Sequence, residues 1–288
     1  MKYTVLSLFP EITDSFFAAS IMAKAVSRGI VEYRSVNIRD YALDKHHTCD
    51  DAPYGGGAGM LMLTEPLGRA LEAVGVKRRI LAGDVGPDVS QFEEPAVPDT
   101  EAGPIDTGLT EPIRPDSCRK RVIYLSPSGR PFNQKLAQEL AGEDELILLC
   151  GRYEGIDQRI IDLYVDDEIS VGDYVLSSGE AAALVLIDAT YRLVDRVITP
   201  ESLDEESFSG NLLEYPQYTR PEVYATLKVP EVLLSGHHEN IRRWRRRKQV
   251  EKTLALRPDL IRQGEEQGLF DTETAHIIAD LRSEDPGT

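Results

Sequence analysis

The alternation of apolar and polar positions over the first two-thirds of the chain predicts an α/β domain. The continuous apolar runs VIYL and LILLC are typical of strands covered on both faces, as in a parallel sheet. Strands are predicted at residues 3–8, 31–37, 122–125 and 145–150, with an extended stretch at 168–176. Helical spacing predicts helices at residues 13–27, 65–74 (capped by Thr64), 133–141, 157–163 and 180–193.

The last third of the chain has a different pattern. A polar stretch follows the α/β part, and helical periodicity returns at residues 239–252, 258–264 and 272–282. We therefore expect an α/β domain over residues 1–195, a linker over 196–212 and a small all-helical domain over 213–288.

One segment interrupts the α/β pattern. Residues 84–116 hold six prolines, nine acidic residues and one base, Arg114, with almost no periodicity. This composition predicts a flexible acidic insertion on the surface of the first domain.

Composition narrows the class of protein. Of the 288 residues, 41% are hydrophobic and 28% charged, which is ordinary for a soluble globular chain, and no apolar run is long enough to cross a membrane. The apolar run at the start of the chain is broken at Pro10 and is too short for a signal peptide. Cys49, Cys118 and Cys150 lie far apart, so no disulfide framework or metal site is predicted. A reducing cytoplasm fits best.

Charge is unevenly distributed along the chain. The net charge of -17 argues at first against a nucleic-acid partner. Residues 242–248, however, pack six cations into seven positions around Trp244. Such a cluster suits phosphate binding with one stacking surface. The alternative is a solvated basic helix with Trp244 in the core.

Three glycine-bearing turns, at residues 126–129, 151–155 and 172–179, each follow a predicted strand. Ligands of open α/β sheets bind beyond the carboxyl ends of the strands. Glycine lets the backbone come close to a ligand there. A single such turn would only reverse the chain, but three in succession favour a ligand site. The run at 55–59 is no phosphate loop, because it lacks the Gly-Lys-Ser/Thr ending and a preceding strand.

Several longer strings resemble the bacterial tRNA (guanine-N1)-methyltransferase (TrmD) family, and they occur in the family's order. The resemblance covers residues 1–76 and 121–288. The strings are LFPE, RDY (39–41), DDAPYGGGAGM (50–60), YLSPSGR (124–130), LLCGRYEGID (148–157), VGDYVLSSGE (171–180), YPQYTRPEV (215–223) and LLSGHHENIRRWR (233–245).

This resemblance implies a fold and a function. The family belongs to the SPOUT class, whose parallel sheet ends in a trefoil knot that holds S-adenosylmethionine. Its members methylate N1 of the guanine immediately 3′ of the anticodon of tRNA. They work as homodimers with composite active sites, and the helical domain holds the tRNA. The resemblance implies neither a DNA nor a membrane partner, and a magnesium requirement is left open.

The resemblance also assigns residues. It implies that Glu154 and Arg192 lie near the target guanine. We expect Arg243, in the basic cluster, to contact the tRNA, and we leave open whether His46 and Asp50 do so or only shape their loop. The expected cofactor residues are Tyr124, Leu125, Pro127, Gly151, Val171, Gly172, Asp173, Tyr174, Val175 and Leu176, and the expected guanine loop holds Gly55, Gly56, Gly57 and Gly59.

The expected general base departs from the family pattern. The family places an aspartate immediately before a Ser-Phe pair, whereas here Glu206 precedes Ser207 and Phe208. A carboxylate is the right chemical type to take the proton of guanine N1. A register slip would give the role to Asp204; we favour Glu206 because the Ser-Phe pair follows it directly. Without the resemblance, these acids would be interpreted as a solvated linker.

Negative charge develops on guanine O6 as N1 loses its proton, so an arginine is expected nearby, and Arg192 is our candidate. The main competing hypothesis is a catalytically weak or silent RNA-binding homologue of the same fold. It is favoured if Glu206 cannot replace the aspartate. A small-molecule methyltransferase is disfavoured, because it would not need a helical domain with an arginine run.

Overall fold

The computed structural model describes residues 1–80, 119–198 and 207–284. These fall into two compact units, Met1–Val197 and Ile198–Thr288, and each is described by itself. The predicted insertion at 84–116, Cys118 and both candidate bases, Asp204 and Glu206, lie outside the described residues.

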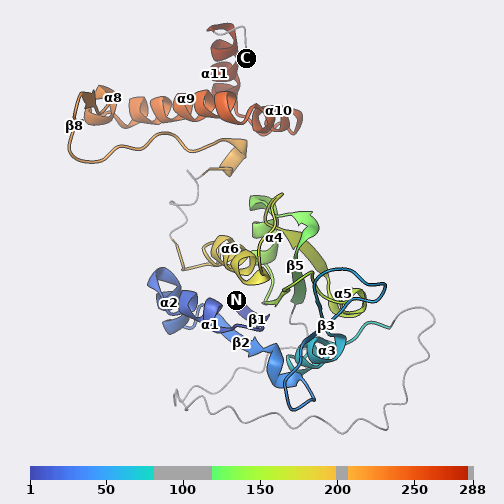
Figure 1. Ribbon diagram of the computed structural model, residues 1–288. Helices are drawn as coiled ribbons and strands as arrows, with labels where there is room; N and C mark the ends of the chain where they lie inside the picture. Colours follow the sequence, from blue (N-terminus) through green and yellow to red (C-terminus); the bar gives the residue numbers. More distant parts are fainter. Residues whose placement is uncertain (81–118, 199–206, 285–288) are drawn as a thin grey trace. The chain divides into compact units, whose positions relative to one another are not determined.

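The first unit is built on a five-stranded sheet in the order β2-β1-β6-β5-β7 (Figure 1). Every neighbouring pair in this sheet is parallel, which confirms the predicted parallel α/β class. The strands are β1 (Lys2–Ser7), β2 (Glu32–Asn37), β5 (Lys120–Pro131), β6 (Glu145–Cys150) and β7 (Asp167–Ser170).

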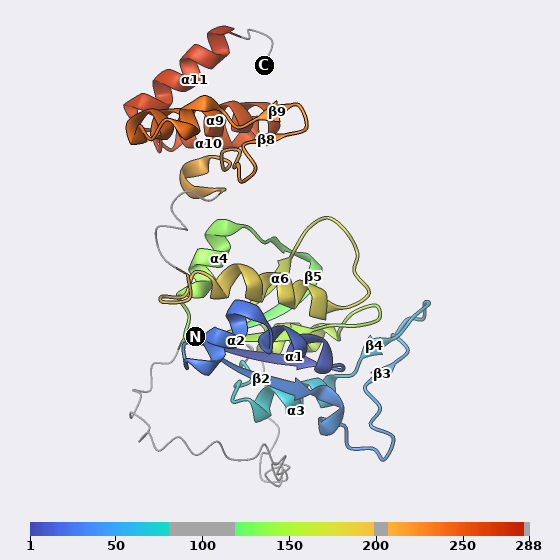
Figure 2. The same ribbon diagram turned by 90° about the vertical axis from the view of Figure 1, so that its left-hand side faces the viewer.

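Helices cover both faces of the sheet (Figure 2). One face carries α1 (Glu11–Phe17), α2 (Ser20–Ser27), α4 (Gln134–Ala141) and α6 (Gly179–Tyr191). The other carries α3 (Thr64–Ala73), α5 (Gln158–Tyr164) and a short 3₁₀ helix, η1 (Ile38–Tyr41). The central strand β6 is buried along its whole length, with Leu148 packed on one side and Ile147 on the other. Burial on both faces explains why this strand is a continuous apolar run.

The predicted helix over 13–27 is wrong in one respect, because it is two helices. Ala19 is extended and Ser20 has a positive φ of 52°. In one continuous helix Phe17 and Met22 would point about 140° apart. The break lets both side chains pack on the same face of the sheet.

The helix predicted to begin under a Thr64 cap begins with that residue instead. Leu63 is the N-cap, and no side chain accepts a hydrogen bond there. Two other helices do have side-chain caps: Asn133 accepts from the backbone N–H of Leu136, and Asp157 accepts from that of Arg159.

A small hairpin projects from the first unit. Strands β3 (Asp50–Asp51) and β4 (Leu61–Met62) pair antiparallel and carry the glycine-rich loop between them. The hairpin is joined to the rest of the unit where Met62 bridges Ile156 and its N–H donates to the carbonyl of Gly155.

The second unit is mainly helical, with α8 (Glu231–Leu234), α9 (His238–Leu256), α10 (Pro258–Glu266) and α11 (Thr272–Glu284). The three predicted helices are confirmed. The expectation of an all-helical domain missed a two-stranded hairpin, β8 (Val223–Tyr224) and β9 (Leu227–Lys228), and the short η3 (Ser209–Asn211). Leu212, which we expected in the linker, is buried in the core of this unit with Val250, Ile261 and Ile278.

Among the helices of the described ranges, none is both long and apolar enough to span a membrane.

Candidate functional site

A cavity of about 590 Å³ opens at the carboxyl ends of β5, β6 and β7. Its volume lies in the range of small-molecule sites. The three glycine-bearing turns all contribute to its wall. Asp173, expected to bind the cofactor, is exposed and does not line it. The other expected cofactor residues all do: Tyr124, Leu125, Pro127, Gly151, Val171, Gly172, Tyr174, Val175 and Leu176.

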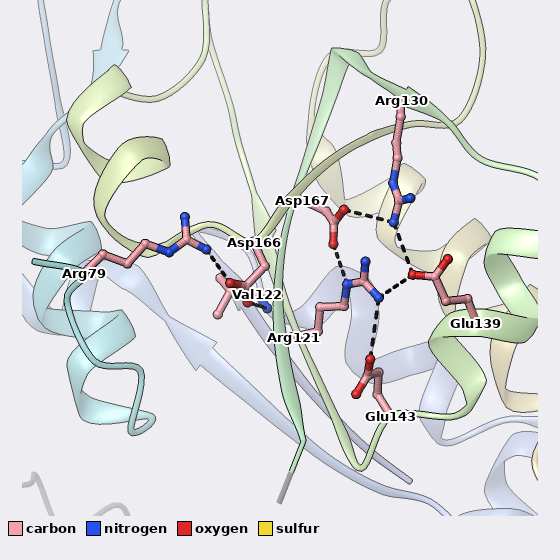
Figure 3. A network of polar contacts seen from close by, with 8 residues as sticks. All are labelled: Arg79, Arg121, Val122, Arg130, Glu139, Glu143, Asp166 and Asp167. Carbon is pink, nitrogen blue, oxygen red and sulfur yellow. Dashed lines mark hydrogen bonds and ion pairs between the residues drawn. The ribbon is translucent and has the colours of Figure 1, made fainter. Parts of the chain in front are cut away.

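The first turn is an excursion of β5 away from the sheet. Leu125 and Arg130 both pair with Ile169 of β7, so residues 126–129 leave the strand and return to the same place. The carboxylate of Asp167 holds both sides of this excursion, since Arg121 donates to one oxygen and Arg130 lies 2.9 Å from the other (Figure 3).

Further carboxylates on α4 and beside it complete this network. The guanidinium of Arg121 donates to Glu139 at 2.6 Å and lies 3.5 Å from Glu143. The hydrogen bond to Asp167 raises the pKa of Arg121 most, so this side chain stays charged. The network therefore fixes the base of the first turn against β7 and α4. A separate pair, Arg79 with Asp166, lies nearby in Figure 3 but does not touch the turn.

The glycines of these turns serve close packing of one chain segment on another. A β-carbon at Gly151 would lie 2.9 Å from the ring of Tyr124, and one at Gly179 would lie 2.8 Å from the Cα of Cys150. At Gly129 it would collide with the backbone of Glu168 and Ile169. We expected glycine at these three positions to leave room for a ligand. Instead, glycine is needed there because two segments of the protein pack closely together.

The cavity wall combines apolar surface with charge. Leu125, Ile156 and Leu176 offer apolar contact, and the carboxylates of Glu154 and Glu168 line the same space. Burial, and next the charge of Glu168, raise the pKa of Tyr124, so its phenol stays protonated. With Arg152 in the same wall, the site suits a ligand that has an apolar body and charged or polar groups.

The second turn brings Glu154 to the glycine-rich loop. Glu154 donates its backbone N–H to the carbonyl of Met60 at 3.0 Å, and a β-carbon at Gly59 would collide with the Glu154 side chain. The expected guanine loop thus lies beside the expected guanine-facing carboxylate. Gly55, Gly56, Gly57 and Gly59 all have positive φ, between 79° and 127°, which favours glycine at each.

His46 and Asp50 lie at the base of the hairpin rather than at the cavity. His46 is exposed and its backbone N–H donates to Asp44 at 3.0 Å, whereas Asp50 is half-buried in β3. These contacts are local, so the tRNA role of both residues stays a prediction.

Arg192 is not brought to this cavity. It is the C-cap residue of α6, whose 13 residues begin at the cavity with Gly179. At 1.5 Å per residue the helix separates the two ends by about 20 Å. Its guanine-binding role stays a prediction.

After residues 199–206, which lie outside the described ranges, the linker is described again from Ser207. The Oγ atom of Ser207 accepts a hydrogen bond from the backbone N–H of Glu214 at 3.0 Å, and Phe208 is 46% exposed. The Ser-Phe pair is therefore fixed to the helical unit.

The basic cluster lies on the first half of α9, and several of its cations are paired within the unit. Arg242 bonds to Glu239 and Glu273, and Arg243 donates to Glu239 at 3.0 Å. The hydrogen bond from Arg242 lowers the pKa of Glu239 to about 2. Trp244 is half-buried with its ring centroid 6.3 Å from that of Tyr218. Phosphates that bind here would have to compete with these carboxylates.

Sequence reasoning missed four residues that line the cavity or lie beneath it: Ser7, Phe9, Arg152 and Glu180. Arg152 lines the cavity, its guanidinium lies 4.1 Å from the ring centroid of Phe9, and its Nε is 3.9 Å from the Glu180 carboxylate. Three of the four lie in the strings that carry the family resemblance, so a signal was present in the sequence. The resemblance, however, assigned no role to them. Among the described residues, no cluster of side chains could hold a metal ion.

The fold and cavity thus define an α/β protein with a cavity of small-molecule size at the carboxyl edge of a parallel sheet, together with a helical unit that carries a basic helix. Over residues 1–98 and 100–263 the chain matches the family model of the tRNA (Guanine-1)-methyltransferase TrmD. The chain belongs to this family.

Curated relatives share about half of their residues with the chain. It is 54% identical to a tRNA (guanine-N(1)-)-methyltransferase of Treponema denticola over 284 residues, which cover 99% of the chain and 100% of the relative. The protein of that name from Treponema pallidum is 49% identical over 99% of the chain and 98% of its own length. The one from Borreliella burgdorferi is 52% identical over 90% and 92%.

Proposed function

We propose that the protein transfers the methyl group of S-adenosylmethionine to N1 of the guanine immediately 3′ of the anticodon in tRNA. The observation that carries this proposal is the cavity where the three turns meet, in a chain of the tRNA (guanine-N1)-methyltransferase family. Both substrates belong to the cytoplasm, where we place the protein.

The cavity has the properties that S-adenosylmethionine requires. Its apolar wall suits the adenine ring, and the carboxylates of Glu154 and Glu168 favour the positive charge of the sulfonium. When bound, the cofactor supplies an electrophilic methyl group. The sheet and its turns would form the trefoil knot of the SPOUT class around it.

The chain itself must supply proton removal. Glu206 takes the proton of guanine N1, and Arg192 stabilises the negative charge that develops on O6. Glu154 and the adjacent Gly55–Gly59 loop hold the base. Glu206 and Arg192 both follow α6 in the chain, and α6 leads about 20 Å away from the cavity. We therefore propose that in a homodimer Glu206 and Arg192 of one subunit act in the cavity of the other subunit. Each cavity would then receive both side chains from the same partner.

The helical unit binds the tRNA. Arg243 and its neighbours on α9 contact phosphates, exchanging their carboxylate partners for phosphate oxygens. The proposed domains are residues 1–195 and 213–288, with the linker carrying the base.

The direct test is calorimetric titration of the protein with S-adenosylmethionine, followed by methyl transfer to a tRNA transcript and mapping of the modified nucleotide. Glu206→Gln should lower turnover at least about a hundredfold, the scale of general-base loss, and leave cofactor affinity unchanged. Asp204→Asn is the matched control and should stay active. Cofactor binding without methyl transfer by the wild type would indicate a silent RNA-binding homologue.

Mixed dimers test which subunit supplies each group. Glu206→Gln and a variant that cannot bind cofactor are each expected to be inactive as homodimers. Refolded together in equal amounts, they should recover about a quarter of wild-type activity, because random pairing leaves a quarter of the sites intact. Arg192→Ala should recover with the same cofactor-deficient partner but not with Glu206→Gln. Recovery of that last pair would place Arg192 in its own chain's site.

The tRNA contact is tested by salt dependence. Changing Arg243 and Arg246 to alanine should weaken tRNA binding and flatten the plot of affinity against salt concentration. An unchanged slope would assign the cluster to structure alone.

A further inference from the structure

A glutamate is buried beneath the cavity without full hydrogen bonding. Glu180, the second residue of α6, has no exposed surface. One carboxylate oxygen accepts a 2.5 Å hydrogen bond from the hydroxyl of Ser7. The other oxygen is buried and has no hydrogen-bond partner in the described parts of the chain. A buried carboxylate with an unsatisfied oxygen calls for a specific explanation.

The side chains around Glu180 form a closed ring of contacts, which we name the carboxyl-edge cluster (Ser7, Phe9, Arg152 and Glu180). The hydroxyl of Ser7 accepts from the backbone N–H of Phe9 at 2.8 Å while donating to Glu180. The Phe9 ring lies against the guanidinium of Arg152, at 4.1 Å from its centroid. The ring closes where the Nε of Arg152 lies 3.9 Å from a carboxylate oxygen of Glu180.

This ring joins three chain segments that meet at the cavity: the end of β1, the second turn and the start of α6. The backbone already connects the latter two, because the N–H of Gly179 donates to the carbonyl of Gly151 at 2.9 Å and Arg152 bridges Ser178. The Nε of Arg152 is buried and makes no hydrogen bond within the described residues. Glu180 is thus the charge that compensates Arg152 inside the protein.

We propose that Glu180 is a positioning residue for the cofactor cavity. As a buried counter-charge it holds the guanidinium of Arg152 on the Phe9 ring, and thereby holds the second turn at its distance from the third. This inference rests on the proposed function, since the ligand whose binding it serves is S-adenosylmethionine.

The experiment is calorimetric titration of Glu180→Gln with S-adenosylmethionine and with S-adenosylhomocysteine, below the unfolding transition. Glutamine keeps the shape and can still bond to Ser7, but it removes the charge that holds Arg152. Both dissociation constants should rise about tenfold, the scale of one lost side-chain interaction. The KM for S-adenosylmethionine should rise in parallel, with a much smaller change in kcat.

Glu145→Gln is the matched control. Glu145 is also a buried glutamate that accepts from a β1 hydroxyl, that of Thr4 at 2.7 Å, but it lies at the amino end of β6. Its variant should bind both ligands as the wild type does. If the wild type fails to bind S-adenosylmethionine, the proposed function fails. If the wild type binds and Glu180→Gln binds equally well, only the positioning role is overturned.

A double-mutant cycle guards against a purely structural loss. Arg152→Met keeps an unbranched apolar side chain over Phe9 and should weaken ligand binding to the same degree as Glu180→Gln. Because Glu180 acts through Arg152, the double variant should still be about tenfold weaker than the wild type, not a hundredfold. Additive losses would overturn the proposal. Ser7→Ala, which removes only a hydroxyl, should give a smaller loss in the same direction.

Discussion

Each end of the sheet has a buried glutamate, and the two carboxylates differ in how completely they are hydrogen-bonded and paired with cations. At the amino end, Glu145 receives the hydroxyl of Thr4 and two ammonium groups, those of Lys2 at 3.1 Å and Lys120 at 3.3 Å. We name these four residues the amino-edge cluster. At the carboxyl end, one oxygen of Glu180 accepts the Ser7 hydroxyl and lies 3.9 Å from the Nε of Arg152, too far for a hydrogen bond, while the other oxygen is left unsatisfied.

This difference in hydrogen bonding indicates that one glutamate serves the stability of the fold and the other serves ligand binding. A fully bonded buried carboxylate stabilises the fold, whereas an incompletely bonded one lowers stability and persists where a binding site requires it. The cavity lies at the carboxyl end only, where strand ends and turns leave backbone and side-chain groups free to meet a ligand. We therefore expect substitutions at the amino end to change stability and equivalent ones at the carboxyl end to change binding.

The largest effect is expected from Gly172→Trp. Gly172 has a φ of 151°, which strains any other residue, and a β-carbon there would collide with the Tyr174 ring, so this ring of the cavity wall must move. Calorimetry should detect no binding of S-adenosylmethionine. Gly29→Trp is the control at the amino end, because Gly29 also has a positive φ, of 66°, but open space around it. It should lose some stability and keep its affinity; loss of binding in both variants would show that the two ends are not independent.

Removing the satisfied carboxylate should act on stability. Glu145→Ala deletes a buried side chain and leaves the Thr4 hydroxyl without its acceptor. We expect unfolding to become easier by about 2–3 kcal/mol, from the lost hydrogen bond and the cavity. Denaturant unfolding measures this, and cofactor affinity in the folded protein should be unchanged. A weaker affinity would contradict the separation of the two ends.

A smaller effect is expected where the first turn is fixed to the sheet. Arg130→Ala removes the pair with Asp167 at the end of the excursion, so residues 126–129 should become less ordered. Affinity for S-adenosylmethionine should fall about threefold, in line with a partly exposed ion pair worth under about 1 kcal/mol. Arg79→Ala, which breaks the neighbouring pair with Asp166, is the control and should bind normally.

The smallest effect concerns pH. Burial alone would raise the pKa of Glu145, but the hydrogen bonds from Thr4 and Lys2 outweigh it and the pKa is lowered. A carboxyl with a lowered folded-state pKa stabilises the fold above its unfolded pKa, about 4.3, and this contribution is lost as the pH falls through the folded value. The stability difference between wild type and Glu145→Gln should therefore be constant near pH 7 and shrink below about pH 4.5. A difference that grows in acid would show the opposite shift.

Much of the fold could be predicted, because it follows from patterns of residues that are close together in the sequence. The strand VIYL and the strand LILLC are apolar on both faces because both faces are covered, and the spacing of Leu67 and Leu71 shows the buried side of α3. The break between α1 and α2 could not be predicted, because it depends on where the sheet lies relative to Phe17 and Met22.

Much of the site could also be predicted, since the turns after three strands must meet at one edge of a parallel sheet. The sequence could not show that Arg192 lies a helix length from the cavity while Gly59 touches Glu154.

By itself, the sequence determined the parallel α/β class, the three turns, the family and most of the residues around the cavity. These follow from periodicity and from strings whose residues are neighbours along the chain. Only the tertiary structure decided that Ser7, Phe9, Arg152 and Glu180 form one cluster, because they come from three separated segments. Hydrogen bonding and charge compensation depend on distances of a few ångströms, and those distances exist only once β1, β6 and α6 have packed together.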